Sequence, residues 1–187
     1  MSIRYRIHLD APLRIGTGLP SLTADDTVVR GPAGPLVPST TIKGAVRAAA
    51  AAVDDPPLED QLLLEVFGRR DGSGGTALFS DALPAAGVTP IVSEITRVAL
   101  TPARTARRGR LLTHEVVLPE APRNGELVPL VFEGTVRFRT SSTDAVRAVV
   151  QGLSRVDGIG ADRSRGLGSV RFAIDPAIVR QALEVAS

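Results

Sequence analysis

A turn followed at once by a helix, in residues 34–47, constrains the fold of this chain more than any other stretch. Pro38 has no backbone N–H and pushes Val37 into an extended conformation, so a short apolar strand has to end there. Hydroxyl side chains that could cap the free N–H groups of the following helix come next: Ser39, Thr40 and Thr41. The helix is predicted to continue through an alanine-rich stretch to Val53.

The start of this helix is a candidate anion site. A helix N-terminus offers unpaired N–H groups and a partial positive charge, and Lys43 and Arg47 lie four residues apart on one face. Phosphate is the anion that we expect there. The alternative is a capped helix with two solvated cations. The stretch is not a P-loop, because Gly44 follows the lysine and no Ser or Thr comes after it.

Arginine dominates the basic residues. The 187-residue sequence has 22 Lys+Arg and 20 Asp+Glu, and Lys43 is the only lysine, which leaves 21 arginines. Arginine keeps its charge and binds phosphate through a bidentate fork, which favours an anionic partner. A GC-rich genome, whose codons favour arginine, is the alternative explanation. The length predicts a single domain over residues 1–187.

Several classes of protein are excluded by what the sequence lacks. It has no cysteine, which rules out disulfides, thiolate nucleophiles and thiolate zinc sites. No apolar run approaches the ~18 residues of a membrane span, and the N-terminus does not resemble a signal peptide. We therefore expect a cytoplasmic protein with no membrane partner. His8 and His114 lie in strand-like contexts without a nucleophile elbow, so we interpret both as structural or surface histidines.

Hydrophobic periodicity predicts a mixed fold. Apolar and polar residues alternate along 3–9, which indicates a half-buried strand. Further helices are predicted at 58–67, 144–155 and 176–185, and further strands at 91–100, 112–118, 127–139 and 169–174. The order strand, helix, two strands, helix, strand predicts an α+β fold with a ferredoxin-like, RRM-like βαββαβ core. No aromatic RNP motif is present, so RNA binding would use backbone contacts more than base stacking.

A run of cations lies between the predicted strands at 91–100 and 112–118. It contains four arginines and no acid: Arg104, Arg107, Arg108 and Arg110. Clustered arginines at a hairpin tip favour contact with nucleic acid. The alternative is a solvated tip. We interpret residues of about 99–116 as an inserted basic β-hairpin.

Two glycine-rich stretches complete a pattern that resembles a known family. Residues 13–18 carry a glycine pair, and residues 157–172 contain a glycine-rich loop followed by the start of a strand. Together with the turn at 34–47, they resemble the RAMP superfamily of CRISPR proteins, and most of all the backbone subunit of type III effector complexes. Residues 37–44 resemble the family's Ile-Pro-Gly-Ser-Ser-Leu-Lys-Gly turn. Residues 160–168 resemble its Gly-Gly-x-x-Ser-Arg-Gly-x-Gly loop, with Ala161 in place of the second glycine.

This resemblance implies an RNA-binding surface. In the family, the inserted hairpin is a thumb that crosses the guide–target duplex, and the glycine loop lets the backbone approach RNA closely. The residues implied to bind RNA are Ser39, Thr40, Lys43, Arg47, Arg104, Arg107, Arg108, Arg110, Gly160, Arg163, Ser164, Arg165, Gly166 and Gly168.

Asp25 and Asp26 are the remaining candidates for chemistry. Acids in a loop can bind Mg²⁺ or Mn²⁺ weakly while substrate phosphates complete the coordination; the alternative is a solvated acidic turn. The resemblance implies that an aspartate before a short strand takes part in metal-dependent cleavage of target RNA. Counting back from Val28–Arg30, Asp25 is the best match and the expected metal ligand. The register stays open, so both acids are candidate catalytic residues.

Three functions are consistent with these observations. The first is a CRISPR RNA-binding backbone subunit of a type III effector complex that also cleaves target RNA with a divalent metal. The second is a structural RAMP subunit without catalysis, and the third is an unrelated small phosphate-ligand-binding domain. For the first, the expected partners are guide RNA, target RNA, other RAMP subunits, and copies of the chain itself in a filament.

Overall fold

A computed structural model describes the chain except for residues 54–57, 70–72, 101–104, 141 and 185–187. Its centre is an antiparallel sheet in the strand order β11-β1-β10-β4, with β5 also paired to β10. The strands of this sheet are β1 (Ser2–Leu9), β4 (Ala77–Phe79), β5 (Leu83–Pro84), β10 (Val131–Phe138) and β11 (Val170–Ile174). The predicted alternation along β1 is confirmed, because its odd-numbered residues from Ile3 to Leu9 are buried.

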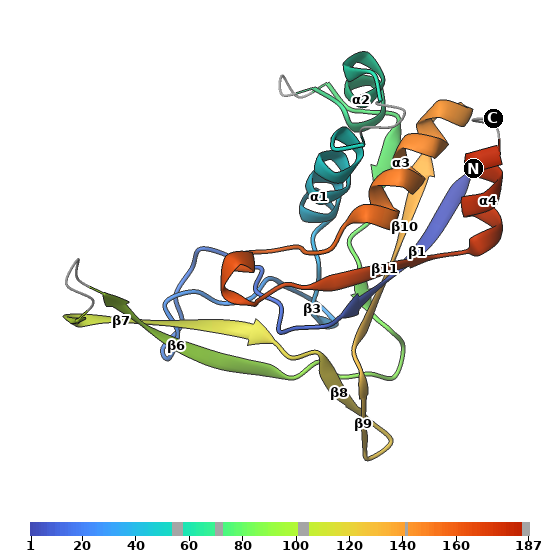
Figure 1. Ribbon diagram of the computed structural model, residues 1–187. Coiled ribbons are helices and arrows are strands. Elements are labelled where there is room, and N and C mark those ends of the chain that lie inside the picture. Colours follow the sequence, from blue (N-terminus) through green and yellow to red (C-terminus); the bar gives the residue numbers. More distant parts are fainter. Residues whose placement is uncertain (54–57, 70–72, 101–104, 141, 185–187) are drawn as a thin grey trace.

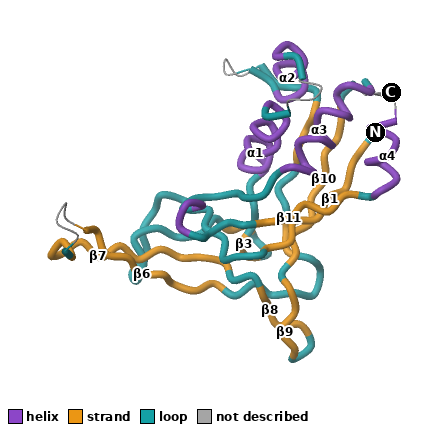
Figure 2. Tube along the Cα trace, viewed as in Figure 1, coloured by secondary structure: helices purple, strands orange, loops and turns teal. Residues whose placement is uncertain are grey.

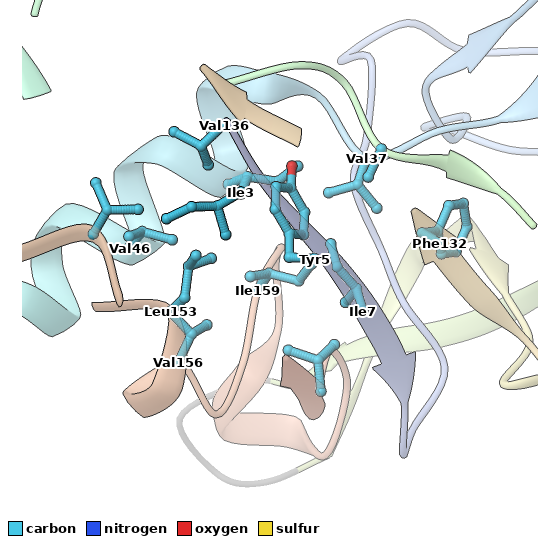
Figure 3. Close-up of a cluster of buried hydrophobic side chains, with 14 of the residues drawn as sticks. Ile3, Tyr5, Ile7, Val37, Val46, Phe132, Val136, Leu153, Val156 and Ile159 are labelled. Atoms are coloured by element: carbon cyan, nitrogen blue, oxygen red, sulfur yellow. The ribbon is translucent and has the colours of Figure 1, made fainter. Parts of the chain in front are cut away.

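Helices pack against one face of this sheet (Figures 1 and 2). They are α1 (Ser39–Ala51), α2 (Asp60–Phe67), α3 (Thr143–Arg155) and α4 (Pro176–Glu184). Val46 of α1 and Leu153 of α3 join Ile3 and Tyr5 of β1 in a single core (Figure 3). Gly152 brings α3 close to α1, since a Cβ there would lie 2.5 Å from the carbonyl oxygen of Val46.

The opposite face of the sheet is exposed and carries both charged and apolar side chains. It carries Arg4, Arg6 and Ala173, and a depression of about 800 Å³ lies over it. Its lining residues come from β1, β10, β11 and the segments around Ser80 and Pro176. None of the candidate catalytic or RNA-binding residues lines this depression.

Two hairpins extend from the sheet (Figure 1). The longer joins β6 (Val92–Leu100) to β7 (Ala106–Val117), and the shorter joins β8 (Glu120–Arg123) to β9 (Glu126–Pro129). A small pair, β2 (Arg30–Gly31) and β3 (Gly34–Pro35), precedes α1, and a 3₁₀ turn, η1 (Arg163–Arg165), precedes β11.

The predicted α+β class is confirmed, but two strands were predicted wrongly. The strand expected over 112–118 begins earlier, since β7 starts at Ala106 and takes in arginines that we expected in the hairpin tip. We expected a continuous strand over 127–139, whereas the structure has β9 and β10 with a break at Leu130. The N–H of Leu130 donates to the carbonyl of Pro119 (2.7 Å), and its side chain is fully buried. β9 therefore pairs with β8 in a separate hairpin instead of extending the sheet, and hydrophobic alternation alone does not reveal such a change of partner.

Candidate functional site

Residues 13–29, here called the N-terminal loop, lie along the base of the β6–β7 hairpin. Leu13 exchanges two backbone hydrogen bonds with Val117 of β7, each 2.8 Å long. Further along, Asp26 forms a parallel bridge with His114, and Gly16 pairs with Val28 across the loop. The loop thus joins the first strand of the sheet to the extended hairpin.

Asp25 lies on this loop with its side chain exposed. Its N–H donates to the carbonyl of Thr113, and its Oδ2 accepts from the N–H of Thr113, both at 2.7 Å. Within the described chain, its Oδ1 accepts no hydrogen bond. The structure thus fixes the direction of this carboxylate and leaves its Oδ1 without a partner among the described residues.

Asp26 has a different environment. Its Oδ2 accepts from Arg14 at 2.9 Å, its Oδ1 accepts from the N–H of Gly18 at 2.8 Å, and its side chain is only 14% exposed. A Cβ at Gly16 would lie 1.9 Å from Oδ2, so the glycine makes room for this carboxylate. Both oxygens of Asp26 are therefore engaged within the protein.

Arg14 links Asp26 to a second acid, Asp162. Arg14 Nη1 donates to Asp162 Oδ2 at 2.5 Å, while Arg97 and Arg165 each lie 3.0 Å from Asp162 Oδ1. Burial would raise the pKa of Asp162, but the hydrogen bond from Arg14 and the charges of Arg97, Arg14 and Arg165 outweigh it and lower that pKa. We call these five residues the Arg14 network.

Glu115 of β7 forms a hydrogen bond with Val28, near the C-terminal end of the N-terminal loop. Its Oε2 accepts from the N–H of Val28 at 2.9 Å and pairs with Arg30 at 2.8 Å. The hydrogen bond from Arg30 is the main reason that the pKa of Glu115 is lowered. His114 and His8 both lie in strands, as expected. The Nδ1 of His114 is buried and has no hydrogen-bond partner among the residues that the structure describes.

Residues 157–168, here called the glycine loop, pack against the N-terminal loop. The N–H of Ala161 donates to the carbonyl of Arg14, and the N–H of Gly168 to that of Pro12, both at 2.9 Å. Gly160 has a φ of +81°, and a Cβ there would lie 2.3 Å from the Arg14 carbonyl oxygen. Ile159 anchors the loop in the core (Figure 3).

The arginines of the glycine loop are exposed but already paired with acids. Arg163 pairs with Asp157 at 2.8 Å, and Arg165 with Asp162. Their side chains are 55% and 66% exposed, so these ion pairs are weak and open to competition from phosphate. Ser164 lies between them in η1.

The start of α1 differs from the expectation in how it is capped. Pro38 is the N-cap residue, and its side chain cannot accept a hydrogen bond. The hydroxyl residues predicted to cap the helix lie one to three positions later, inside its first turn. Instead, the N–H of Ser39 donates to Asp81 Oδ1 at 2.7 Å. Asp81 thus occupies part of the predicted anion site, and Arg47 donates to the carbonyl of Gly68 at 3.0 Å.

The expected RNA-binding residues lie on three segments, which are α1, the β6–β7 hairpin and the glycine loop. No hydrogen bond or ion pair among described residues joins Ser39, Thr40 or Lys43 to the glycine loop. Arg104 lies outside the described residues. Arg107, Arg108 and Arg110 have their backbone in β7, and their side chains lie outside the described part of the structure.

The residues that the sequence did not single out are those that join the loops. Arg14, Arg97, Asp162 and Glu115 make contacts between segments far apart in the chain. Only Arg14 and Asp162 carried any signal, since both lie within the glycine-rich motifs. The pairing of Glu115 with Arg30 depends on the hairpin lying beside the N-terminal loop.

Within the described residues, no group of three or more His, Cys, Asp or Glu side chains could hold a metal ion. A divalent metal at Asp25 would therefore need substrate oxygens and water for most of its coordination, a ligand set that suits Mg²⁺. No helix in the described ranges has the length and apolar character needed to cross a membrane.

Comparison with known proteins identifies the family. The model of the RAMP superfamily matches residues 6–171. The chain belongs to the RAMP superfamily. No curated protein matches it. Among solved structures, this RAMP protein is similar to a chain of the type III-B Cmr-β complex in its apo state, with 11% identity and a TM-score of 0.71, over 95% of this chain and 98% of that one.

A second similar chain comes from type III-B Cmr-β bound to cognate target RNA. It is 12% identical to this RAMP protein, with a TM-score of 0.73, over 97% of this chain and 98% of that one. At this level of identity the likeness concerns the fold. The near-complete coverage of both chains means that the hairpins and loops are included in it.

Proposed function

We propose that this RAMP protein is a CRISPR RNA-binding backbone subunit of a type III effector complex. We also propose that it cleaves target RNA, with Asp25 as the catalytic residue. Family membership and the similarity to Cmr-β chains support the effector assignment. The partners would be guide RNA, target RNA, other RAMP subunits, and further copies of the chain. The order of strands and helices in the sheet supports a ferredoxin-like core.

The single observation that carries the catalytic part is the contrast between the two acids. Asp25 is exposed, its Oδ2 is fixed by Thr113 and its Oδ1 has no partner among described residues, whereas both oxygens of Asp26 are engaged. An oriented carboxylate with a free oxygen can take part in chemistry, and a carboxylate enclosed by an arginine cannot do so without breaking its ion pair. We therefore assign Asp25 as the catalytic residue and metal ligand.

The RNA would lie across the glycine loop and the β6–β7 hairpin. Arg163 and Arg165 are exposed enough to exchange their acids for phosphates. The basic hairpin would contact the guide–target duplex, and Asp25 lies beside its base because Thr113 belongs to β7. Lys43, together with Ser39 and Thr40, would contact phosphate at the start of α1.

The chain itself supplies few reacting groups, so its main contribution would be orientation. Mg²⁺ or Mn²⁺ at Asp25 would neutralise charge on the target phosphate. The hairpin and the N-terminal loop would hold the target so that the 2′-oxygen, the phosphorus and the leaving 5′-oxygen are in line. The 2′-oxygen bonds to phosphorus, the bond to the 5′-oxygen breaks, and the 2′-hydroxyl proton ends on the leaving oxygen.

The test is cleavage of a labelled target by the assembled effector complex containing Asp25→Ala or Asp26→Ala. We expect Asp25→Ala to abolish cleavage while target binding is retained, and a target with a 2′-deoxy group at the cleaved position to survive. Asp10→Ala, which removes an exposed ion pair with Arg171, is the control. Full cleavage by the Asp25→Ala complex, or cleavage in excess EDTA, would show that the assignment is wrong.

A structural RAMP subunit without catalysis is the second candidate. Membership of the RAMP superfamily supports this role as well as the first. Membership of the RAMP superfamily removes the third hypothesis, an unrelated phosphate-ligand-binding domain. Target binding without Mg²⁺-dependent cleavage by the wild-type complex would favour the structural role.

A further inference from the structure

We infer that Arg14 is a positioning residue that links the acidic segment to the glycine loop, so that guide RNA held at the glycine loop sets the position of Asp25. This inference rests on the proposed function and concerns its regulation. Among the described residues, no hydrogen bond or ion pair joins Asp25 to Arg14, so the influence passes through Asp26, its neighbour in the chain.

The first support is the geometry of the guanidinium. Arg14 donates Nη2 to Asp26 and Nη1 to Asp162, with all three side chains no more than 16% exposed. Charges in such poorly solvated positions are tolerated only when they are paired and hydrogen-bonded. Without Arg14, the negative charges of Asp26 and Asp162 would lie close together with less positive charge to neutralise them. The N-terminal loop and the glycine loop would then separate.

The second support is that the main chain makes the same link. The Arg14 carbonyl accepts from the N–H of Ala161 in the glycine loop. Gly160 allows this close approach, since any Cβ there would meet that carbonyl. At the other end, Gly16 abuts the carboxylate of Asp26. A shift of the glycine loop is therefore passed to Asp26 with little room for either segment to move alone.

The third support is the position of the outer partners of Asp162. Arg165 is 66% exposed on the glycine loop, while Arg97 of β6 is 22% exposed at the hairpin. RNA phosphate can draw Arg165 away from Asp162, which leaves Arg14 and Arg97 as its remaining partners. Guide RNA at the glycine loop would thus strengthen the attachment of Asp162 to the N-terminal loop and to the hairpin together.

The experiment compares Arg14→Gln and Arg14→Lys in the assembled complex, with Arg171→Gln as a matched control that breaks an exposed ion pair elsewhere. For Arg14→Gln, we expect target affinity within about twofold of wild type. Cleavage at saturating target should fall by about tenfold to a hundredfold, as for a misplacement of about 1 Å. Arg14→Lys should recover part of the rate, since lysine keeps the charge but cannot bridge both acids in the same way.

Hydrogen exchange gives a readout that does not need cleavage. In the wild-type chain, guide RNA should increase the protection of backbone amides in residues 16–26, and this increase should be lost in Arg14→Gln. A double-mutant cycle with Asp162→Asn should show that the two substitutions are not additive in cleavage rate. Equal protection in both chains, or additive effects, would overturn the inference.

Different results would contradict the catalytic role of Asp25 and the positioning role of Arg14. A wild-type complex that binds target but does not cleave would remove the proposed catalysis, and the exchange measurement would then decide the role of Arg14. If Arg14→Gln lowers affinity and cleavage equally, together with the thermal midpoint, Arg14 is a structural residue and the inference is wrong. Should Arg14→Gln fail to fold, Arg14→Lys decides by the same measurements: wild-type cleavage and protection in that variant would overturn the inference.

Discussion

Gly166 and Gly168 share a left-handed backbone but differ in their surroundings. Their φ values are +81° and +72°, yet a Cβ at Gly166 would meet nothing within 4 Å, whereas one at Gly168 would lie 2.0 Å from the carbonyl oxygen of Ile159. We expect Gly166→Ala to lower the free energy of unfolding by about 1 kcal/mol, the conformational cost alone. Gly168→Ala should cost at least about 2 kcal/mol more, because the backbone must also move.

Urea unfolding of the two variants measures this difference. Gly87→Ala is a suitable control, since Gly87 also has a positive φ and open space around it, and it lies outside the site. Equal loss of stability in Gly166→Ala and Gly168→Ala would contradict the packing of the glycine loop described above. Intact RNA affinity in a folded Gly166→Val variant would indicate that this position only connects two segments.

At the scale of residues, the sequence offered both acids as candidates but could not show that their surroundings differ. Asp25 and Asp26 are adjacent and chemically identical, so nothing local distinguishes them. The difference arises from Arg14 and Thr113, which reach the two acids from segments that meet only in the fold. The capping of α1 was wrong for the same reason: local hydroxyls suggested self-capping, and Asp81 came from a distant part of the chain.

Among the elements, the β6–β7 hairpin depends most on its attachments. A two-stranded hairpin is marginally stable alone in water, and its base is held by backbone bonds to Leu13, Asp25 and Asp26. If its arginines contact phosphate, each one lost should reduce the salt slope of RNA binding by about one. We therefore expect Arg107→Ala with Arg108→Ala to lower the slope by about two, measured as affinity against salt concentration.

Arg6→Ala is the matched control for this measurement. Arg6 is an exposed strand arginine paired with Glu133 on the sheet, and its loss should leave the slope unchanged. An unaltered slope and affinity in the Arg107/Arg108 variant would mean that the hairpin does not touch RNA. The hairpin would then be a solvated tip, the alternative that the sequence left open.

Elements with a local signal were predicted well. β1 showed clean alternation, and α3 begins where its capping residues predicted, with Ser142 accepting from the N–H of Ala145. The strand expected at 127–139 failed because its two halves have the same periodicity but different partners. Periodicity reports burial on one face; it does not report which neighbour provides that burial.

For the whole molecule, the expected behaviour is assembly along RNA. One domain of this size spans only a few nucleotides, so a guide RNA needs several copies or several different subunits. Head-to-tail contacts that do not close into a ring produce a filament. We expect a monomer or weak oligomer without RNA and ordered stacking with guide RNA, measured by native mass spectrometry and electron microscopy.

Mixing guide RNA with chains of two different masses would report the exchange of copies and their number per guide. A guide RNA shortened in steps should reduce the copy number in steps. A stable closed dimer that persists in the presence of guide RNA would argue strongly against this arrangement.

The ion pair between Arg14 and Asp162 also bears on how the protein is made. The two residues are 148 positions apart, so a chain emerging from the ribosome has Asp25 long before it has the acid that completes the Arg14 network. Domains fold as units once their contacts become available. Until the glycine loop has been synthesised, Arg14 and Asp26 of a nascent chain would therefore lack their partner Asp162. A product that terminates before Asp162 would contain Asp25 but not the complete Arg14 network that we infer to position it.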